Sequence, residues 1–219
     1  TRLLNVTGVQ TCALRSLIIE AVYENRVVKE AVTREAVPHL SADGFFASNT
    51  STLPISGLAQ NVRQPNRFIG IHFFSPVNKM RVVEIIRGEQ TDDDTLAKAY
   101  DYVQQIGKLP IVVNDARGFY TSRTFGTFVM EGAAMLGEGI PAAVIENAAM
   151  QCGMPVGPLA VLDETALSLS VQVLDQTRSD YQAMGKTYQA SAGELLVERM
   201  VKVHNRSGRA AGGGFYDYP

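Results

Sequence analysis

His72 and Glu84 are the residues of this sequence whose types and surroundings most favour acid–base chemistry. His72 interrupts the apolar run Phe68–Phe74, and Glu84 stands inside the apolar run Val82–Ile86. An ionised carboxylate among apolar residues loses hydration worth several kcal/mol unless it is paired. A buried pair between the two side chains would compensate for this loss. It would also raise the histidine's affinity for a proton toward that of a useful general base.

Both residues also have an ordinary structural interpretation. A single histidine in an apolar strand can be a core residue whose hydrogen bonds are satisfied. Glu84 can be an edge-strand carboxylate that faces water, because a one-residue shift of register turns a side chain to the other face. His39 and His204 are expected to be surface or helix-capping residues. The residues alone therefore leave the catalytic and the structural interpretation open.

Polar residues follow two of the predicted strands. The segment 48–52, Ser-Asn-Thr-Ser-Thr, follows one, while Glu24, Asn25 and Lys29 follow another. In open α/β sheets, ligands bind outside the carboxyl ends of the strands. The alternatives are a Ser/Thr turn that caps the next helix, and a solvated helix start with an exposed lysine.

Short apolar strands alternate with helices through the first half of the chain. The predicted strands are 17–19, 45–47, 68–74, 82–86 and 108–113. One predicted helix carries an apolar stripe, and another begins after Asp92, which can cap it. The stripe consists of Val28, Val32, Ala36 and Leu40, and the second helix has Leu96, Tyr100, Val103 and Ile106 on one face. This alternation is typical of an α/β layer with a largely parallel sheet.

The pattern changes to helical spacing after Asp115. Helices are expected around 125–136, 142–152 and 195–203. We therefore predict an α/β domain over 16–116 and an all-helical domain over 117–219. Residues 1–15 show no sustained period and are left unassigned, and a non-native origin is one interpretation of them.

The composition excludes several classes of protein. The chain has 46% hydrophobic and 19% charged residues and a formal net charge of −2, as in ordinary globular proteins. This charge gives no electrostatic footprint for nucleic acid, and no apolar run approaches the ~18–20 residues of a transmembrane helix. Cys12 and Cys152 are too few for a disulfide framework or a metal cluster, and Cys152 is expected to be a small core residue. We expect a cytoplasmic protein without a metal site.

Six sequence blocks occur in an order and spacing that resemble the 3-hydroxyacyl-CoA dehydrogenase family. The resemblance covers residues 16–219. Two blocks, HFFSPVNKM and GFYTSR, are most similar to the dehydrogenase part of multifunctional fatty-acid oxidation α-subunits, which also carry an enoyl-CoA hydratase. The other blocks are IIEAVYENRVVKEAV, SNTSTLPIS, MPVGPLAVLDE and GGGFYDYP.

The resemblance implies a fold, a reaction and roles for individual residues. The fold would be the C-terminal part of a Rossmann-like domain followed by the helical domain of this family. The reaction would be the NAD-dependent oxidation of (3S)-3-hydroxyacyl-CoA to 3-oxoacyl-CoA in fatty-acid β-oxidation. His72 would remove the hydroxyl proton, Glu84 would orient His72, and Ser51 would bond near the reacting hydroxyl and contact both cofactor and substrate.

The resemblance also implies binding residues and partners. Glu24, Asn25, Lys29 and Ser75 would contact the dinucleotide, and Ser122 the substrate. Ser75 stands where many members have asparagine, and so does Ser122; both departures are found in the multifunctional subclass. A full-length parent would form a homodimer or join a thiolase-containing multienzyme complex.

One feature that the resemblance implies does not occur in the sequence. Members begin with a strand, a Gly-x-Gly-x-x-Gly turn and an acidic residue for the adenosine ribose. No such glycine turn occurs here, so we expect an N-terminally truncated piece with weak NAD affinity and little or no activity alone. Two alternatives remain: a β-hydroxyacid dehydrogenase that acts on a substrate without CoA, and a non-catalytic fragment whose helical half forms an interface.

Overall fold

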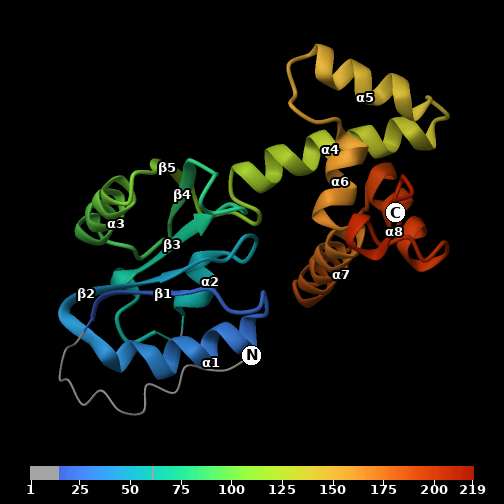
Figure 1. The fold of residues 1–219 in the computed structure, drawn as a ribbon. Coiled ribbons are helices and arrows are strands. Elements are labelled where there is room, and N and C mark those ends of the chain that lie inside the picture. The colour runs from blue at the N-terminus through green and yellow to red at the C-terminus, as the bar shows by residue number, and fades with distance from the viewer. Residues whose placement is uncertain (1–14, 61) are drawn as a thin grey trace. The chain divides into compact units, whose positions relative to one another are not determined.

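The structure is a computed structural model that describes residues 15–60 and 62–219 (Figure 1). The chain divides into two compact units, Thr1–Arg123 and Thr124–Pro219. Most of the segment 1–15 lies outside the described residues. Within the described part of the chain, no helix is both long enough and apolar enough to cross a bilayer.

The first unit is built on a five-stranded sheet with the strand order β1-β2-β3-β4-β5. β1, β2 and β3 are parallel, β4 runs antiparallel to β3, and β5 is parallel to β4. The connection between β3 and β4 is too short for the crossover that a parallel pair needs, which explains the reversal. All five predicted strands are confirmed. They are Arg15–Glu20, Leu40–Ser48, Phe68–Phe73, Val82–Arg87 and Leu109–Asn114.

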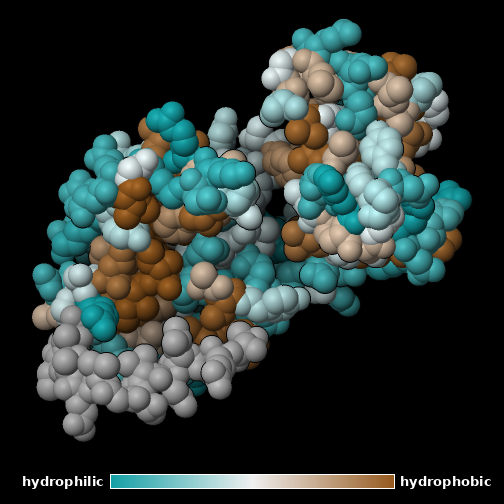
Figure 2. Space-filling model, in the orientation of Figure 1, coloured by the Kyte–Doolittle hydropathy of each residue, from teal (hydrophilic) through white to brown (hydrophobic). Residues whose placement is uncertain are grey.

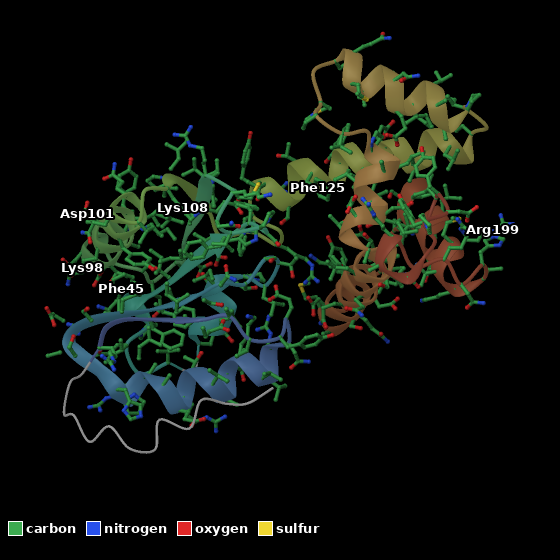
Figure 3. All side chains as sticks on the ribbon, viewed as in Figure 1. Phe45, Lys98, Asp101, Lys108, Phe125 and Arg199 are labelled. Atoms are coloured by element: carbon green, nitrogen blue, oxygen red, sulfur yellow. The ribbon has the colours of Figure 1, made fainter. Side chains whose placement is uncertain are left out.

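Helices cover both faces of this sheet. The helices of the first unit are α1 (Arg26–Ala36), α2 (Ile55–Ala59) and α3 (Asp93–Gln105), with short 3-10 helices at Val37–His39 and Pro65–Arg67. α3 packs on one face against Phe45, Ile69, Ile71 and Val83, and α2 on the other against Phe46 and Phe68. Successive residues of β2 thus point to opposite faces. Figure 2 shows apolar side chains gathered on this unit where Figure 3 labels Phe45.

The sequence predicts where a helix begins better than it predicts which side chains the helix buries. Asp92 caps α3 by accepting a hydrogen bond of 2.8 Å from the amide of Thr95, as predicted. The apolar stripe predicted for α1 is confirmed only in part, because Ala36 and Leu40 pack against the core, whereas Val28 is exposed and the fully buried positions of the helix are Lys29 and Thr33. The reason is an ion pair of Lys29, described below, which turns this polar face toward the sheet.

The second unit is all-helical, as expected. It contains most of α4 (Thr121–Gly137), which begins in the first unit, and four further helices. Cys152 directly follows α5 and is exposed, so its assignment to the core is wrong. The further helices are α5 (Ala142–Gln151), α6 (Pro158–Thr165), α7 (Leu167–Ala183) and α8 (Ala192–Lys202), followed by a 3-10 turn at Arg209–Ala211.

A buried carboxylate fixes the C-terminal segment of the second unit. Asp163, on α6, accepts hydrogen bonds from the amides of Phe215 (2.8 Å) and Tyr216 (3.0 Å) and from the hydroxyl of Tyr218 (3.0 Å). A Cβ atom at Gly214 would lie 1.8 Å from Asp163 Oδ1, so this position needs glycine. The triple glycine therefore serves a close backbone approach.

Candidate active site

The register of β3 and β4 places His72 directly opposite Glu84. The distance from His72 Nδ1 to Glu84 Oε2 is 2.7 Å, and the two residues are 5% and 0% exposed. Glu84 lies in an interior strand, with β3 on one side and β5 on the other. The interpretation of Glu84 as an edge carboxylate that faces water is therefore wrong.

Three further hydrogen bonds engage the Glu84 carboxylate. Oε1 accepts from the amides of Tyr120 (3.1 Å) and Thr121 (2.8 Å), and Oε2 accepts from the Thr121 hydroxyl (2.7 Å). Burial raises the pKa of the Glu84 carboxyl, but the hydrogen bonds from His72 and Thr121 outweigh burial and hold that pKa below its ordinary value. Glu84 is thus a buried carboxylate that stays ionised.

The ionised state of Glu84 determines which imidazole nitrogen is left for chemistry. An ionised carboxylate only accepts hydrogen bonds, so the proton is assigned to His72 Nδ1 and the lone pair to Nε2. The rings of Phe74 and Phe119 lie 4.5 and 6.1 Å from the imidazole, centroid to centroid. The pair can therefore accept a proton at Nε2 while Glu84 compensates the resulting positive charge.

Glu24 shapes the polar segment that follows β2. Its Oε1 atom accepts from the Thr50 hydroxyl (2.6 Å), the Ser51 amide (3.0 Å), and the Thr52 amide and hydroxyl (2.9 and 3.0 Å). Burial raises the pKa of Glu24, but the Thr50 hydrogen bond, the Lys29 charge and the Thr52 hydrogen bonds together lower it below the ordinary value. Glu24 is thus an ionised centre around which this loop folds.

The loop is tied to the strand that carries His72. Asn49 Oδ1 accepts a hydrogen bond of 2.8 Å from the amide of Phe73, and the Ser122 hydroxyl donates to the Ser51 carbonyl at 3.3 Å. Asn49 was not singled out from the sequence. Its position at the end of a strand, in a run of polar residues, was the available signal.

Lys29 is almost completely buried, with 1% of its surface exposed. Its ammonium donates to both carboxylate oxygens of Glu20 (3.1 and 3.2 Å) and to the Val22 carbonyl (3.2 Å), and it lies 3.4 Å from Glu24 Oε2. Ser48 also donates to Glu20. The alternative of an exposed lysine is wrong. Glu20 is not among the predicted site residues, although a carboxylate that ends an apolar strand resembles the pattern at Glu84.

Hydrogen bonds and ion pairs divide the predicted site residues into groups. One network contains Glu24, Lys29, Ser51 and Ser122. The His72–Glu84 pair is connected to this network by hydrogen bonds of residues that are adjacent in sequence to these six. Asn25 instead caps α1 by accepting from the amide of Val28 at 3.2 Å. Ser75 is exposed on the segment after β3. Figure 3 labels Lys108, whose ammonium donates to the carbonyls of Val77 and Met80 and so holds the β3–β4 connection.

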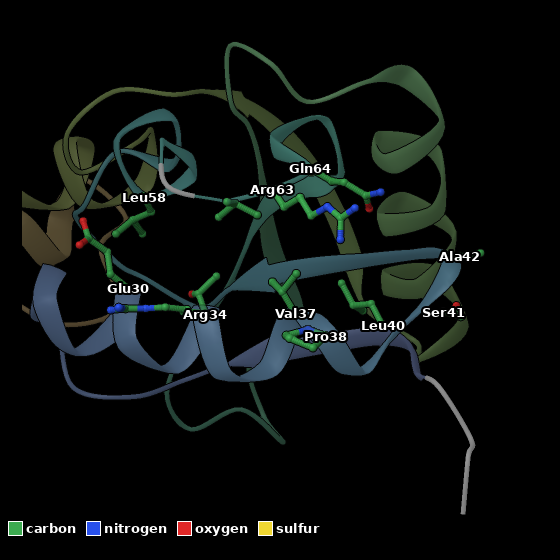
Figure 4. Close-up of a pocket in the computed structure, with 12 residues that line it drawn as sticks. Glu30, Arg34, Val37, Pro38, Leu40, Ser41, Ala42, Leu58, Arg63 and Gln64 are labelled. Carbon is green, nitrogen blue, oxygen red and sulfur yellow. The ribbon is translucent and has the colours of Figure 1, made fainter.

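A cavity of about 650 Å³ lies elsewhere in the first unit (Figure 4). Its walls come from α1, the 3-10 turn after it, the start of β2, and the segment from α2 to Gln64. Arg34 and Arg63 line it together with apolar residues, among them Val37 and Leu58. None of the predicted site residues lines this cavity, so its size gives no support to a catalytic role.

Two family models match the chain. The model described as "3-hydroxyacyl-CoA dehydrogenase, NAD binding domain" matches residues 1–116. The model described as "3-hydroxyacyl-CoA dehydrogenase, C-terminal domain" matches residues 118–218. Together these two models cover almost the whole chain.

Solved structures with similar folds include three that bear directly on this family. The (S)-3-hydroxybutyryl-CoA dehydrogenase PaaH1 from Ralstonia eutropha is 32% identical with a TM-score of 0.84, and the match covers 94% of this chain and 72% of that chain. FadB2 from M. tuberculosis is 28% identical (TM-score 0.83), with the same coverage. A 3-hydroxybutyryl-CoA dehydrogenase from Escherichia coli K12 is 28% identical (TM-score 0.84) over 97% of this chain and 44% of that chain. The chain belongs to the family of NAD-dependent 3-hydroxyacyl-CoA dehydrogenases.

Proposed function

We propose that this chain carries the catalytic residues for the oxidation of (3S)-3-hydroxyacyl-CoA to 3-oxoacyl-CoA, the dehydrogenation step of fatty-acid β-oxidation. The observation that carries the proposal is the buried His72–Glu84 pair, with a separation of 2.7 Å. The pair lies near the carboxyl ends of β1, β2 and β3, and open α/β sheets bind their ligands outside these strand ends.

In the proposed mechanism His72 is the general base. Its Nε2 atom accepts the proton of the 3-hydroxyl group, and the Glu84 carboxylate stabilises the imidazolium that forms. Ser51 donates a hydrogen bond near the reacting oxygen and so orients the alcohol. NAD+, when bound, supplies the hydride acceptor for C3. A positioned base of this kind contributes roughly 10²–10⁴-fold to the rate.

The residues present fit one part of the dinucleotide. Within the described part of the chain the Ser51 hydroxyl makes no hydrogen bond to the protein, so it is available to a ligand. Hydroxyl and carboxylate groups suit the ribose and the nicotinamide amide, and we propose Ser51, Ser75, Glu24 and Asn25 for these contacts. Lys29 supports them through its ion pair with Glu24. The sequence contains no Gly-x-Gly-x-x-Gly turn, so we assign no residue to the pyrophosphate.

A short-chain substrate is the second candidate within the same chemistry. Two of the solved structures reported above are named 3-hydroxybutyryl-CoA dehydrogenases, which favours a four-carbon acyl group. We propose that Ser122 contacts the substrate, since its hydroxyl is bonded to the backbone of the Ser51 loop. A cytoplasmic location and a homodimeric or multienzyme assembly complete the proposal.

The proposal is tested in an enzyme made by joining this chain behind the glycine-rich strand–turn–helix of a solved relative, called the completed enzyme below. The measurement is NADH consumption with acetoacetyl-CoA, with longer 3-oxoacyl-CoA esters and with free acetoacetate. We expect turnover of CoA esters that requires His72. Equal rates in wild type and His72→Ala would contradict the mechanism, and a preference for free acetoacetate would contradict the substrate class.

A further inference from the structure

Thr121 contacts both oxygens of the Glu84 carboxylate. Its amide donates to Oε1 at 2.8 Å and its hydroxyl donates to Oε2 at 2.7 Å. One residue therefore binds the carboxylate in a bidentate manner, at its backbone and its side chain. His72 Nδ1 and the Tyr120 amide occupy the remaining directions.

This arrangement fixes the plane of the carboxylate. Each carboxylate oxygen offers two lone-pair directions, and each Glu84 oxygen receives two hydrogen bonds. Hydrogen bonds to an ionised group are shorter and stronger than neutral ones, so they restrain rotation about the last side-chain bond. The direction of the lone pair that meets His72 is thereby set by Thr121 and Tyr120.

The backbone before α4 aims these donors at Glu84. Gly118 and Phe119 have φ angles of +72° and +49°, and Phe119 is 2% exposed. A positive φ is unfavourable for phenylalanine, so packing around the buried ring must hold this turn. The Gly118 amide also donates to the Thr52 carbonyl at 3.3 Å, which anchors the turn to the Ser51 loop.

We infer that Thr121 is a positioning residue for the His72–Glu84 pair, because its hydroxyl and amide together hold the Glu84 carboxylate in the orientation that receives the His72 Nδ1 proton. The inference rests on the proposed function, in which this pair is the catalytic one. Without the hydroxyl, Oε2 keeps only its bond to His72, and the carboxylate can rotate away from the imidazole.

The test uses the chain with ¹⁵N-labelled histidine. The sequence has three histidines, so His72→Gln identifies the His72 signals. The measured quantity is the rate at which the proton on His72 Nδ1 exchanges with solvent. Thr121→Val keeps the amide donors and the shape of the side chain, and we expect it to speed this exchange about tenfold, the effect of one hydrogen bond to a charged group. Thr121→Ser should restore the wild-type rate.

Two results would overturn the inference: Thr121→Val that exchanges at the wild-type rate, or Thr121→Ser that exchanges as fast as Thr121→Val. Thr165→Val is the matched control, because the Thr165 hydroxyl bonds only to carbonyls of its own helix, and it should leave the exchange rate unchanged. If Thr121→Val does not fold, Thr121→Ala replaces it in the comparison with Thr121→Ser.

Turnover of the completed enzyme separates this inference from the proposed function. If His72→Ala leaves turnover intact while Thr121→Val still speeds proton exchange, Thr121 positions a pair that does no chemistry, and only the proposed function fails. If turnover requires His72 but Thr121→Val changes neither proton exchange nor kcat, the positioning role fails and the proposed function stands.

Discussion

Glu84 and Glu20 are two buried carboxylates near the end of one sheet at which β1, β2 and β3 finish, and they differ in their partners. Glu84 is 0% exposed and paired with His72 at 2.7 Å, whereas Glu20 is 4% exposed and paired with Lys29 at 3.1 Å. Imidazole gains and loses a proton near neutral pH, while an ammonium group ordinarily keeps its charge. The first pair is thus suited to proton transfer and the second to holding a fixed charge.

The difference shows that burial and pairing do not by themselves mark a catalytic carboxylate. The Lys29 ammonium has three protons, and it meets acceptors on Glu20, Val22 and Glu24. His72 uses one nitrogen for Glu84 and keeps the other, which bonds to no other residue that the structure describes. The second ring nitrogen of His72, which the pair does not use, is what distinguishes the candidate base.

The largest effect should follow from removing this base. We expect His72→Ala to lower kcat of the completed enzyme by roughly 10²–10⁴-fold, because in the direction of reduction the protonated imidazole supplies the proton that the carbonyl oxygen receives as hydride reaches C3. The measurement is steady-state turnover of acetoacetyl-CoA with NADH. His39→Ala, at an exposed histidine, is the control and should keep the wild-type kcat. A rate for His72→Ala within a factor of about two of wild type would mean that the pair is structural.

Removing the partner of the other carboxylate should affect stability instead. Lys29→Met leaves the Glu20 carboxylate buried and uncompensated, and we expect it to lower the free energy of unfolding by about 3–5 kcal/mol. The measurement is urea unfolding of the chain. The double variant Lys29→Met/Glu20→Gln should recover most of this loss, because no buried charge remains.

Lys98→Met is the control for the effect of removing a lysine. Lys98 pairs with Asp94 at 2.6 Å and donates to the Asp43 carbonyl at 3.0 Å, but the side chains of the pair are 38% and 71% exposed, so the loss should stay below about 1 kcal/mol. If Lys29→Met were no more destabilising than Lys98→Met, the Glu20–Lys29 pair would not hold this edge of the sheet.

Glu24 connects the two regions, since it is close to Lys29 and also binds the Ser51 loop. Glu24→Gln keeps an acceptor for the loop but loses the negative charge, and we expect about 1 kcal/mol lower stability at neutral pH. The pKa of Glu24 is lowered in the folded chain, so its contribution is present above the ordinary value of 4.5 and is lost as the pH falls through the folded value. The measurement is urea unfolding at a series of pH values. A difference in the free energy of unfolding between wild type and variant that grows toward acid pH would contradict this prediction.

The sequence predicted the His72–Glu84 pair but not what holds it. The alternation of side chains left this pair open, because a one-residue shift of register would turn Glu84 to the other face, and it was the resemblance to the family that favoured the pair. Thr121 could not be found in this way, because its donors reach Glu84 only through the positive-φ turn at Gly118 and Phe119. Such a turn depends on packing around the phenylalanine ring, which no local pattern records.

The buried face of α1 was missed for a related reason. The periodicity of Val28, Val32 and Ala36 favoured an apolar contact with the sheet, and Ala36 does pack against the core, but the ion pair between Lys29 and Glu20 orients the first turns of the helix. A buried charge outweighs the burial of a valine, since an unpaired charge costs several kcal/mol and a valine contributes roughly 1.5–3 kcal/mol. Contacts between different elements therefore decided both missed features: Thr121 meets Glu84 across 37 residues of sequence, and Lys29 meets Glu20 across 9.

The smallest effect is expected at a third paired carboxylate, Glu198 of α8, which lies at the surface of the second unit. It accepts from Arg178 of α7 at 2.7 and 3.0 Å and from Lys202 at 2.7 Å. These hydrogen bonds, that from Arg178 foremost, lower the pKa of Glu198 to about 2. Its contribution to stability is therefore present above the ordinary value of 4.5 and is lost as the pH falls toward 2.

Water and salt screen this surface group, so Glu198→Gln should cost less than about 1 kcal/mol at neutral pH, and less still at high salt. Urea unfolding at two ionic strengths measures the difference. A loss as large as that of Lys29→Met, unchanged by salt, would show that pairing alone sets how much these carboxylates contribute to the free energy of unfolding. A small, salt-dependent loss would support the conclusion that burial is what makes the Glu20 pair important for stability. The Glu84 pair is also buried, but its partner can exchange a proton, and this makes it suited to catalysis.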